Sequence, residues 1–205
     1  STDGFKLENG KLVENGGGVA NFDVTIPSYG SNNTRVNATL TNINAGNLLA
    51  ALPIELPERI KDLTGNTSGK VNIDGLPNAA TGNIDLSADN GLVAGQNFDS
   101  LKAKAVFAGT QIEVQNVEMN IGSGRLTAEG NYDRGSKDFD ANITGKAIPV
   151  PLILAFLPPN ESIPTIGGSA DVSLVANGNA DRFATINVTG TGIASDVMVG
   201  GNSIG

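Results

Sequence analysis

Apolar and polar residues alternate one for one along most of the chain. In residues 21–26, for example, Phe22, Val24 and Ile26 fall on one face of an extended strand, and polar residues fall on the other face. Residues 35–40 repeat this pattern. Because each segment has one apolar and one polar face, the pattern predicts an antiparallel sheet that is solvated on one side.

The apolar positions of the later segments predict which residues line the apolar face of this sheet. The alternation slips near Gln115 and Asn116, where we expect a β-bulge that restores the face. Short segments that contain Gly, such as 108–110 and 133–137, predict tight turns that make consecutive strands neighbours. The predicted lining residues are Val71, Ile73, Ile84, Leu86, Leu101, Ala103, Ala105, Phe107, Ile112, Val114, Val117, Met119, Ile121, Leu126, Ala128, Phe139, Ala141, Ile143, Val172, Leu174, Ile186 and Val188.

Two segments, 47–60 and 150–163, have apolar residues spaced by three and four instead, which predicts short helices. Prolines keep both helices short. We expect these helices to cover part of the apolar face. The residues assigned to this role are Leu48, Leu49, Leu52, Leu56, Ile60, Leu152, Ile153 and Phe156.

The two helical segments belong to an internal repeat. Residues 35–98 and 139–204, approximately, share the order strand, apolar helix, prolines, glycines, strand and strand. The period is about 102 residues. We therefore expect residues 1–205 to form one continuous β-groove segment, cut from a longer chain. A deletion of residues 35–138 is expected to preserve the strand register.

Composition removes most enzyme classes. The chain has no His and no Cys, which excludes Ser-His-Asp and Cys-His arrangements and thiolate metal sites. Its net charge is −8, and its 13 Lys and Arg residues form no run, so nucleic-acid binding is not expected. The sequence therefore predicts a non-enzymatic protein without a cofactor or metal.

Three segments resemble ligand-binding loops without meeting their requirements. Residues 65–71 resemble a phosphate-binding loop, but the spacing is one residue short and Val71 replaces the magnesium-binding hydroxyl. Residues 16–23 and 85–91 lack the regular ligand spacing of a calcium loop. We expect a turn before a strand at the first segment and solvated turns at the other two.

The whole pattern is more specific than any single motif. A strand ends in "GSGRLTAEGNYD" (122–133), an apolar helix with prolines follows a further strand, and a glycine-containing step ("GNTSG", 65–69) leads into the next strand. This arrangement resembles the TamB and AsmA-like family of the Gram-negative envelope over essentially the whole chain. The resemblance implies a mostly β fold, namely a long curled antiparallel sheet (a β-taco) with short apolar helices about once per 100 residues.

The resemblance also implies a function. Members of this family look like bridges whose apolar groove carries phospholipid acyl chains between inner and outer membranes. It implies a periplasmic location, in a protein anchored in the inner membrane outside this segment. It implies an Omp85-family outer-membrane protein as a partner through the longer chain. A charged residue in place of Leu86, Phe107 or Met119 is expected to block lipid binding without unfolding the sheet.

Two alternatives remain open at this point. The same residues could fill the core of a closed sandwich or barrel, as in a structural or adhesin repeat. The few aromatic residues and the alanines at 103, 105, 128 and 141 favour an open trough instead. The chain could also be a scaffold whose groove or strand edges bind outer-membrane β-barrel proteins during assembly.

Overall fold

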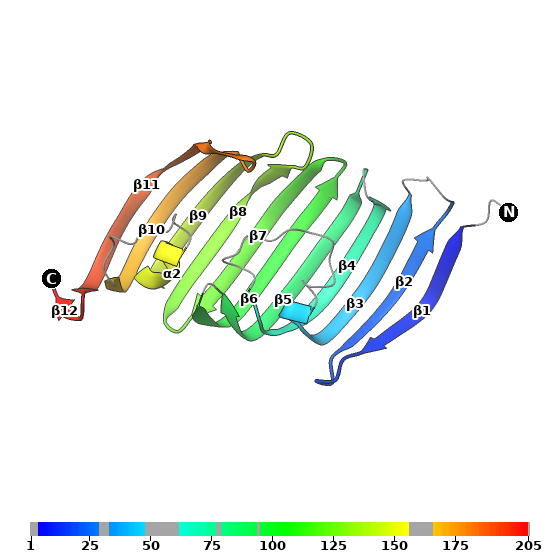
Figure 1. Ribbon diagram of the computed structural model, residues 1–205, viewed down its shortest axis with the longest axis horizontal. Coiled ribbons are helices and arrows are strands. Elements are labelled where there is room, and N and C mark those ends of the chain that lie inside the picture. Colours follow the sequence, from blue (N-terminus) through cyan, green and yellow to red (C-terminus); the bar gives the residue numbers. More distant parts are fainter. Residues whose placement is uncertain are drawn as a thin grey trace.

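The computed structural model describes residues 4–28, 33–47, 62–76, 79–93, 95–155 and 166–204. These residues form one sheet of twelve strands and short helical segments (Figure 1). The strands are β1 (Phe5–Val13), β2 (Val19–Ile26), β3 (Thr34–Asn44), β4 (Asn66–Leu76), β5 (Thr81–Val93), β6 (Gln96–Ala108), β7 (Gln111–Ile121), β8 (Gly124–Asp133), β9 (Asp138–Pro149), β10 (Ile166–Asn179), β11 (Arg182–Val199) and β12 (Asn202–Ser203).

The strands lie in the sheet in the order in which they occur in the chain. Each strand pairs antiparallel with the strands before and after it, and β1 and β12 are the two edges. Figure 1 shows these edges at opposite ends of the molecule. The predicted mostly β fold with consecutive antiparallel strands is therefore confirmed.

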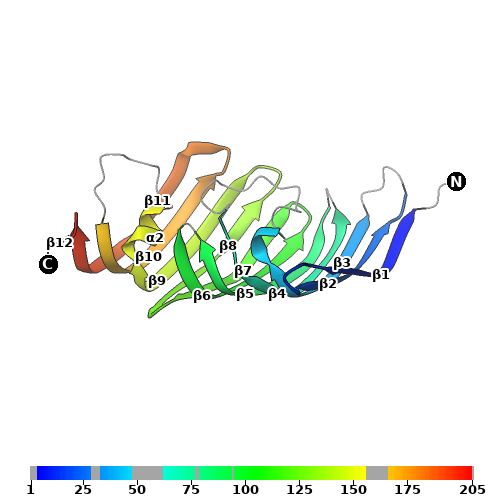
Figure 2. The same cartoon turned by 60° about the horizontal axis from the view of Figure 1, so that its bottom comes forward.

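The sheet is open, and it is not strongly curled (Figure 2). Closure requires the first and last strands to pair, whereas β1 and β12 each have a single strand neighbour among the described residues. The structure therefore excludes a closed sandwich or barrel for this part of the chain. The sheet is also less curled than the resemblance implies, because alternation determines which face is apolar but not how far the sheet bends.

The predicted bulge in β7 is confirmed. In the pairing of β6 with β7, Lys104 faces Asn116 and Ala105 faces Val114, so Gln115 is the extra residue. The extra residue lets Val114 and Val117 lie on the same face, although they are three residues apart.

All three predicted turns are strand in whole or in part, since residues 19–23 of the segment 16–23 lie in β2. Residues 66–71 of the loop-like segment lie in β4, and all of residues 85–91 lie in β5. Gly, Asn and Asp are common in turns, but a strand partner on both sides satisfies the backbone groups here and overrides that preference.

Each repeat begins its helical segment directly after a bulge. Residues 45–47 form a helical turn after β3, and α2 (Val150–Ala155) follows β9. At the bulges, Asn42 and Ala147 adopt positive φ. The side chain of Ser68 accepts a hydrogen bond from the Asn42 amide at 3.0 Å, and Asp171 accepts one from the Ala147 amide at 2.8 Å.

The predicted helix positions are only partly within the described residues. Leu152 and Ile153 lie in α2, as expected. The remaining predicted covering residues fall outside the described ranges, and these are Leu48, Leu49, Leu52, Leu56, Ile60 and Phe156.

Candidate functional site

The apolar positions form four parallel rows that cross the sheet from strand to strand. The rim row consists of Val36, Ile73, Gly82, Phe107, Ile112, Tyr132, Phe139 and Gly178. The first middle row consists of Ala38, Val71, Ile84, Ala105, Val114, Gly130, Ala141, Ala176 and Val188. The second middle row consists of Leu40, Gly69, Leu86, Ala103, Val117, Ala128, Ile143, Leu174 and Gly190. The helix-side row consists of Thr67, Ala88, Leu101, Met119, Leu126, Gly145, Val172 and Gly192.

All but two of the predicted lining residues fall in these rows, and the two exceptions lie beside them. Ile121 pairs with Gly124, one step beyond the helix-side row. Ile186 lies next to Gly178 at the rim row, where the Cα of Ile186 would be 2.7 Å from a Cβ placed on Gly178. The rows therefore join the predicted residues into one continuous apolar face, which we call the groove face.

The helix-side end of the groove face contains the hydrophobic core. Leu152 of α2 is only 1% exposed and packs in one cluster with Met119, Ile121 and Phe98. Leu63, which precedes β4, packs against the same cluster. Helical cover at this end of the strands therefore makes a core there, while most of the rim and middle rows stay half-buried.

Sequence reasoning missed part of this core, namely Val93, Phe98 and Ile148. The apolar positions change from even to odd numbers between Ala88 and Val93, and from odd to even between Ile143 and Ile148. A residue with positive φ lies within each interval, Asn90 in the first and Ala147 in the second. The change between even and odd apolar positions near the end of each strand is the sequence feature that could have revealed these core residues.

The groove face is least covered at β11. Val188 of the first middle row is 57% exposed, whereas the equivalent position on β6, Ala105, is buried. Ala105 pairs with residues of two strands, whereas Val188 pairs only with Ala176 of β10 among the described residues and therefore buries less of its side chain.

Larger residues lie at both ends of the groove face, and smaller ones lie between them. On β6, Phe107 belongs to the rim row and Leu101 to the helix-side row, with Ala103 and Ala105 between them. Tyr132 and Phe139 add aromatic rings to the rim row. The centre of the groove face is therefore lined by Ala, Val, Leu, Ile and Gly side chains, with no charged residue in any of the four rows.

The opposite face of the sheet is polar and acidic. Its central row consists of Asp23, Asn37, Asn72, Asn83, Val106, Glu113, Asn131, Asp140, Asn177 and Asn187. Ion pairs such as Asp85 with Lys104, at 2.9 Å, join neighbouring strands on this face. Both side chains of that pair are about half exposed, so the pair contributes little to stability.

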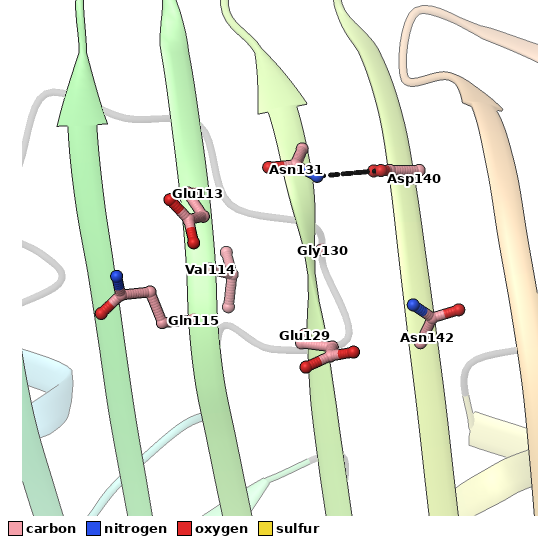
Figure 3. Close-up of a pocket in the computed structure, with 8 residues that line it drawn as sticks. All are labelled: Glu113, Val114, Gln115, Glu129, Gly130, Asn131, Asp140 and Asn142. Carbon is pink, nitrogen blue, oxygen red and sulfur yellow. Dashed lines mark hydrogen bonds between the residues drawn. The ribbon is translucent and has the colours of Figure 1, made fainter.

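A shallow depression on the polar face lies around Gly130, and strands β7, β8 and β9 line it (Figure 3). Glu113, Glu129 and Asp140 surround it, and the Asn131 side-chain nitrogen donates to both Asp140 oxygens at 3.0 and 2.9 Å. The described residues contain no group of three or more His, Cys, Asp or Glu placed to hold a metal ion. Among the described residues, the depression therefore has polar groups but no cluster that could hold a metal ion.

Carboxylates with altered acidity lie at turns instead. The side-chain amide of Asn179 donates to Asp138 at 2.7 Å and lowers the pKa of Asp138. The backbone amide of Gly135 lowers the pKa of Asp133 in the same way. These hydrogen bonds favour the charged carboxylates and stabilise the turns between strands.

The comparisons with known proteins give no relative: no family model, curated protein or solved structure matches this chain. In the part of the chain that the structure describes, no helix has the length and apolar character needed to cross a membrane. The groove face itself is therefore the feature from which a function has to be inferred.

Proposed function

We propose that the groove face binds phospholipid acyl chains. The observation that carries this proposal is the set of aliphatic rows, which continue from β3 to β11 without a charged side chain and stay half-buried over most of their area. Soluble proteins seldom expose apolar surface over so many neighbouring residues unless it binds something. A flexible hydrocarbon chain can bind such a surface because apolar contacts, unlike hydrogen bonds, do not require a particular direction.

The hydrophobic effect is large enough to drive this binding. Burial of a CH₂ group contributes about 0.8 kcal/mol, so a chain of about 16 carbons that buries half its surface gains on the order of 6 kcal/mol before the loss of chain freedom. The small residues of the middle rows let the hydrocarbon approach the backbone closely. The larger rim and helix-side residues would flank it on both sides.

In this proposal the chain is a non-enzymatic segment of an envelope protein of the TamB and AsmA-like kind. The groove face would carry phospholipid between the inner and outer membranes and so support outer-membrane biogenesis. The segment would lie in the periplasm, and an Omp85-family protein would be a partner of the longer chain. The resemblance of the repeat pattern supports this part of the proposal, and the groove face supports lipid binding.

Neighbouring residues of β7 allow a matched test, because Val114 lies on the groove face and Gln115 on the polar face. We expect a photoreactive amino acid at position 114 to crosslink to phospholipid from vesicles, and the same amino acid at position 115 to remain uncrosslinked. Val114→Glu should reduce lipid retention at least about tenfold, because a buried unpaired carboxylate costs several kcal/mol. Gln115→Glu should retain lipid normally.

Circular dichroism provides the control for folding, and both variants should keep the strand spectrum. Equal crosslinking from the two positions, or a purified chain that takes up no phospholipid, would show that the groove face does not bind lipid.

A further inference from the structure

Four Asn-Gly pairs occur in the sequence, and they begin at Asn9, Asn15, Asn90 and Asn177. In such a pair the backbone nitrogen of the glycine can attack the side-chain carbonyl carbon of the asparagine. Glycine favours this attack because it has no Cβ to obstruct the approach. The attack also requires rotation of the backbone between the two residues, so the fold decides which of the four pairs can react.

Three of the four pairs lie within strands, where pairing restricts the backbone. They are Asn9–Gly10 in β1, Asn90–Gly91 in β5 and Asn177–Gly178 in β10. Asn177, for example, is paired on both sides, with Asp140 of β9 and Asn187 of β11. Reaction at such a position requires the strand to open locally first. We therefore expect these three pairs to react slowly in the folded chain.

The fourth pair, Asn15–Gly16, lies in the turn between β1 and β2. The Gly17 amide donates to the Glu14 carbonyl oxygen at 2.9 Å, and the Glu14 amide donates to the Gly18 carbonyl oxygen at 2.8 Å. These two hydrogen bonds close the turn, and Asn15 and Gly16 are its two central residues. Neither central residue takes part in the two bonds, so the bonds leave the Gly16 nitrogen available for the attack.

The surroundings of this pair also leave room for the reaction. Asn15 and Gly16 are both exposed. A Cβ placed on Gly16 would have nothing within 4 Å, whereas one placed on Gly91 would lie 2.1 Å from the Thr64 carbonyl oxygen. Water and a changed backbone geometry are therefore accommodated at Asn15 without displacing other residues.

We propose that Asn15 is a site of spontaneous deamidation. The Gly16 nitrogen loses its proton and forms a bond to the Asn15 Cγ atom, while the bond from Cγ to the side-chain nitrogen breaks and ammonia leaves. The product is a five-membered succinimide ring. Water then opens the ring at either of its two carbonyl groups, which leaves aspartate or isoaspartate at position 15. The reaction is independent of lipid binding, so each proposal can fail without the other.

The position of the site gives the reaction a structural consequence. The neighbouring Glu14 carboxylate accepts a hydrogen bond from the Asn44 amide at 3.0 Å and another from the Asn47 side-chain amide. Glu14 thereby joins the β1–β2 turn to the helical turn that follows β3. Deamidation adds a second negative charge beside Glu14, and isoaspartate also adds a CH₂ group to the main chain there. The modification therefore alters the turn that positions this link.

Peptide mass spectrometry of the purified chain after incubation at mildly alkaline pH tests the proposal, because it distinguishes a side-chain amide from an acid at each of the four positions. We expect Asn15 to deamidate at least about tenfold faster than Asn177, since reaction at Asn177 requires local opening of β10. In urea the four positions should react at similar rates, because each asparagine precedes a glycine. Asn15→Gln is the control, and it should remove the modification at this position, since glutamine would have to form a larger ring.

Three results would overturn the proposal. The first is an Asn15 that keeps its amide under these conditions, and the second is an equal rate at Asn15 and Asn177 in the folded chain. The third is a difference between these two positions that persists unchanged in urea, which would assign it to the neighbouring sequence and not to the fold.

Discussion

Single glycines in the groove face permit close contact between neighbouring strands. Gly69 has a φ of +145°, and a Cβ placed on it would lie 2.1 Å from the carbonyl oxygen of Asp85. We expect Gly69→Ala to lower the free energy of unfolding by about 1–3 kcal/mol, because the neighbouring backbone would have to move. Urea unfolding measures this change. Gly16→Ala is the control, because nothing lies within 4 Å of that Cβ and its effect should be small.

The polar residue Asn179, at the end of β10, connects acidity to stability at the turn between β8 and β9. Its side-chain nitrogen donates to the Ser136 carbonyl and to Asp138, both at 2.7 Å. Because the folded-state pKa of Asp138 is lowered, its stabilising effect is complete above the unfolded-state pKa and is lost as the pH falls through the folded-state pKa. Asn179→Ala should raise the pKa of Asp138 toward its ordinary value and weaken this loss of stability in acid.

An NMR titration of the Asp138 carboxyl carbon measures the first effect. The pKa of Asp133 should change little, because the backbone amide of Gly135 is the main cause of its lowered value. An unchanged Asp138 titration in Asn179→Ala would show that the Asn179 amide does not set the acidity of this carboxylate.

Met119 shows how burial changes a sequence-based expectation. The alternating pattern of its segment predicts that Met119 lines the groove face. A charged residue at this position is therefore expected to block lipid binding without unfolding the sheet. The structure places it in the core cluster beneath α2, with 6% exposure. That expectation is wrong for Met119, because a charge in the core destabilises the fold, whereas Leu86 and Phe107 are only half-buried.

At the scale of the element, α2 is a single helical turn and a half that stabilises one end of the sheet. Leu152 of α2 and Ile148 of β9 are the largest fully buried side chains among the described residues, and both belong to the core cluster. We expect Leu152→Ala to cost about 2–5 kcal/mol in the free energy of unfolding, because it leaves a cavity in the core. Leu154→Ala should cost less, since Leu154 is only half-buried. Equal losses from the two changes in thermal or urea unfolding would contradict the packing described here.

The strands, their order and the bulge of β7 could be predicted because these features depend on local sequence. Alternation fixes the two faces, and glycine-rich turns such as 108–110 connect neighbours. The core residues Val93 and Ile148 could not be predicted by alternation, because positive-φ residues change the phase just before them. The bend of the sheet depends on twist and packing summed over many strands, so no single segment encodes it.

At the scale of the whole molecule, the equivalent bulges of the two repeats are 105 residues apart, one residue more than the 104 that the predicted deletion of residues 35–138 removes. Asn42 and Ala147 are equivalent bulge residues, so Thr34 corresponds to Phe139 and Arg35 to Asp140. A deletion of residues 35–138 would place Phe139 at the position of Arg35, on the polar face. The expectation that this deletion preserves the register is therefore wrong, because a slip of one residue turns every side chain of a strand to the opposite face.

A deletion of residues 35–139 restores the register and gives a matched pair of variants. Thr34 then joins Asp140, and Ala141 takes the place of Val36 on the groove face. We expect this shorter chain to be monomeric with a strand spectrum, and the chain that lacks 35–138 to aggregate. Size-exclusion chromatography and circular dichroism distinguish the two. Similar behaviour of both deletions would show that the face on which side chains lie does not decide folding.

The sequential order of the strands also determines how the protein responds to tension. β1 and β12 lie at opposite ends of the sheet (Figure 1), and in the described part of the chain every other strand pairs only with the strands before and after it. A pull on the two ends would therefore peel strands from the edges one after another, and only one pair of strands would carry the load at any moment. The chain should lengthen in a series of similar small steps at low force, as expected for a quasi-one-dimensional structure, rather than break in one event.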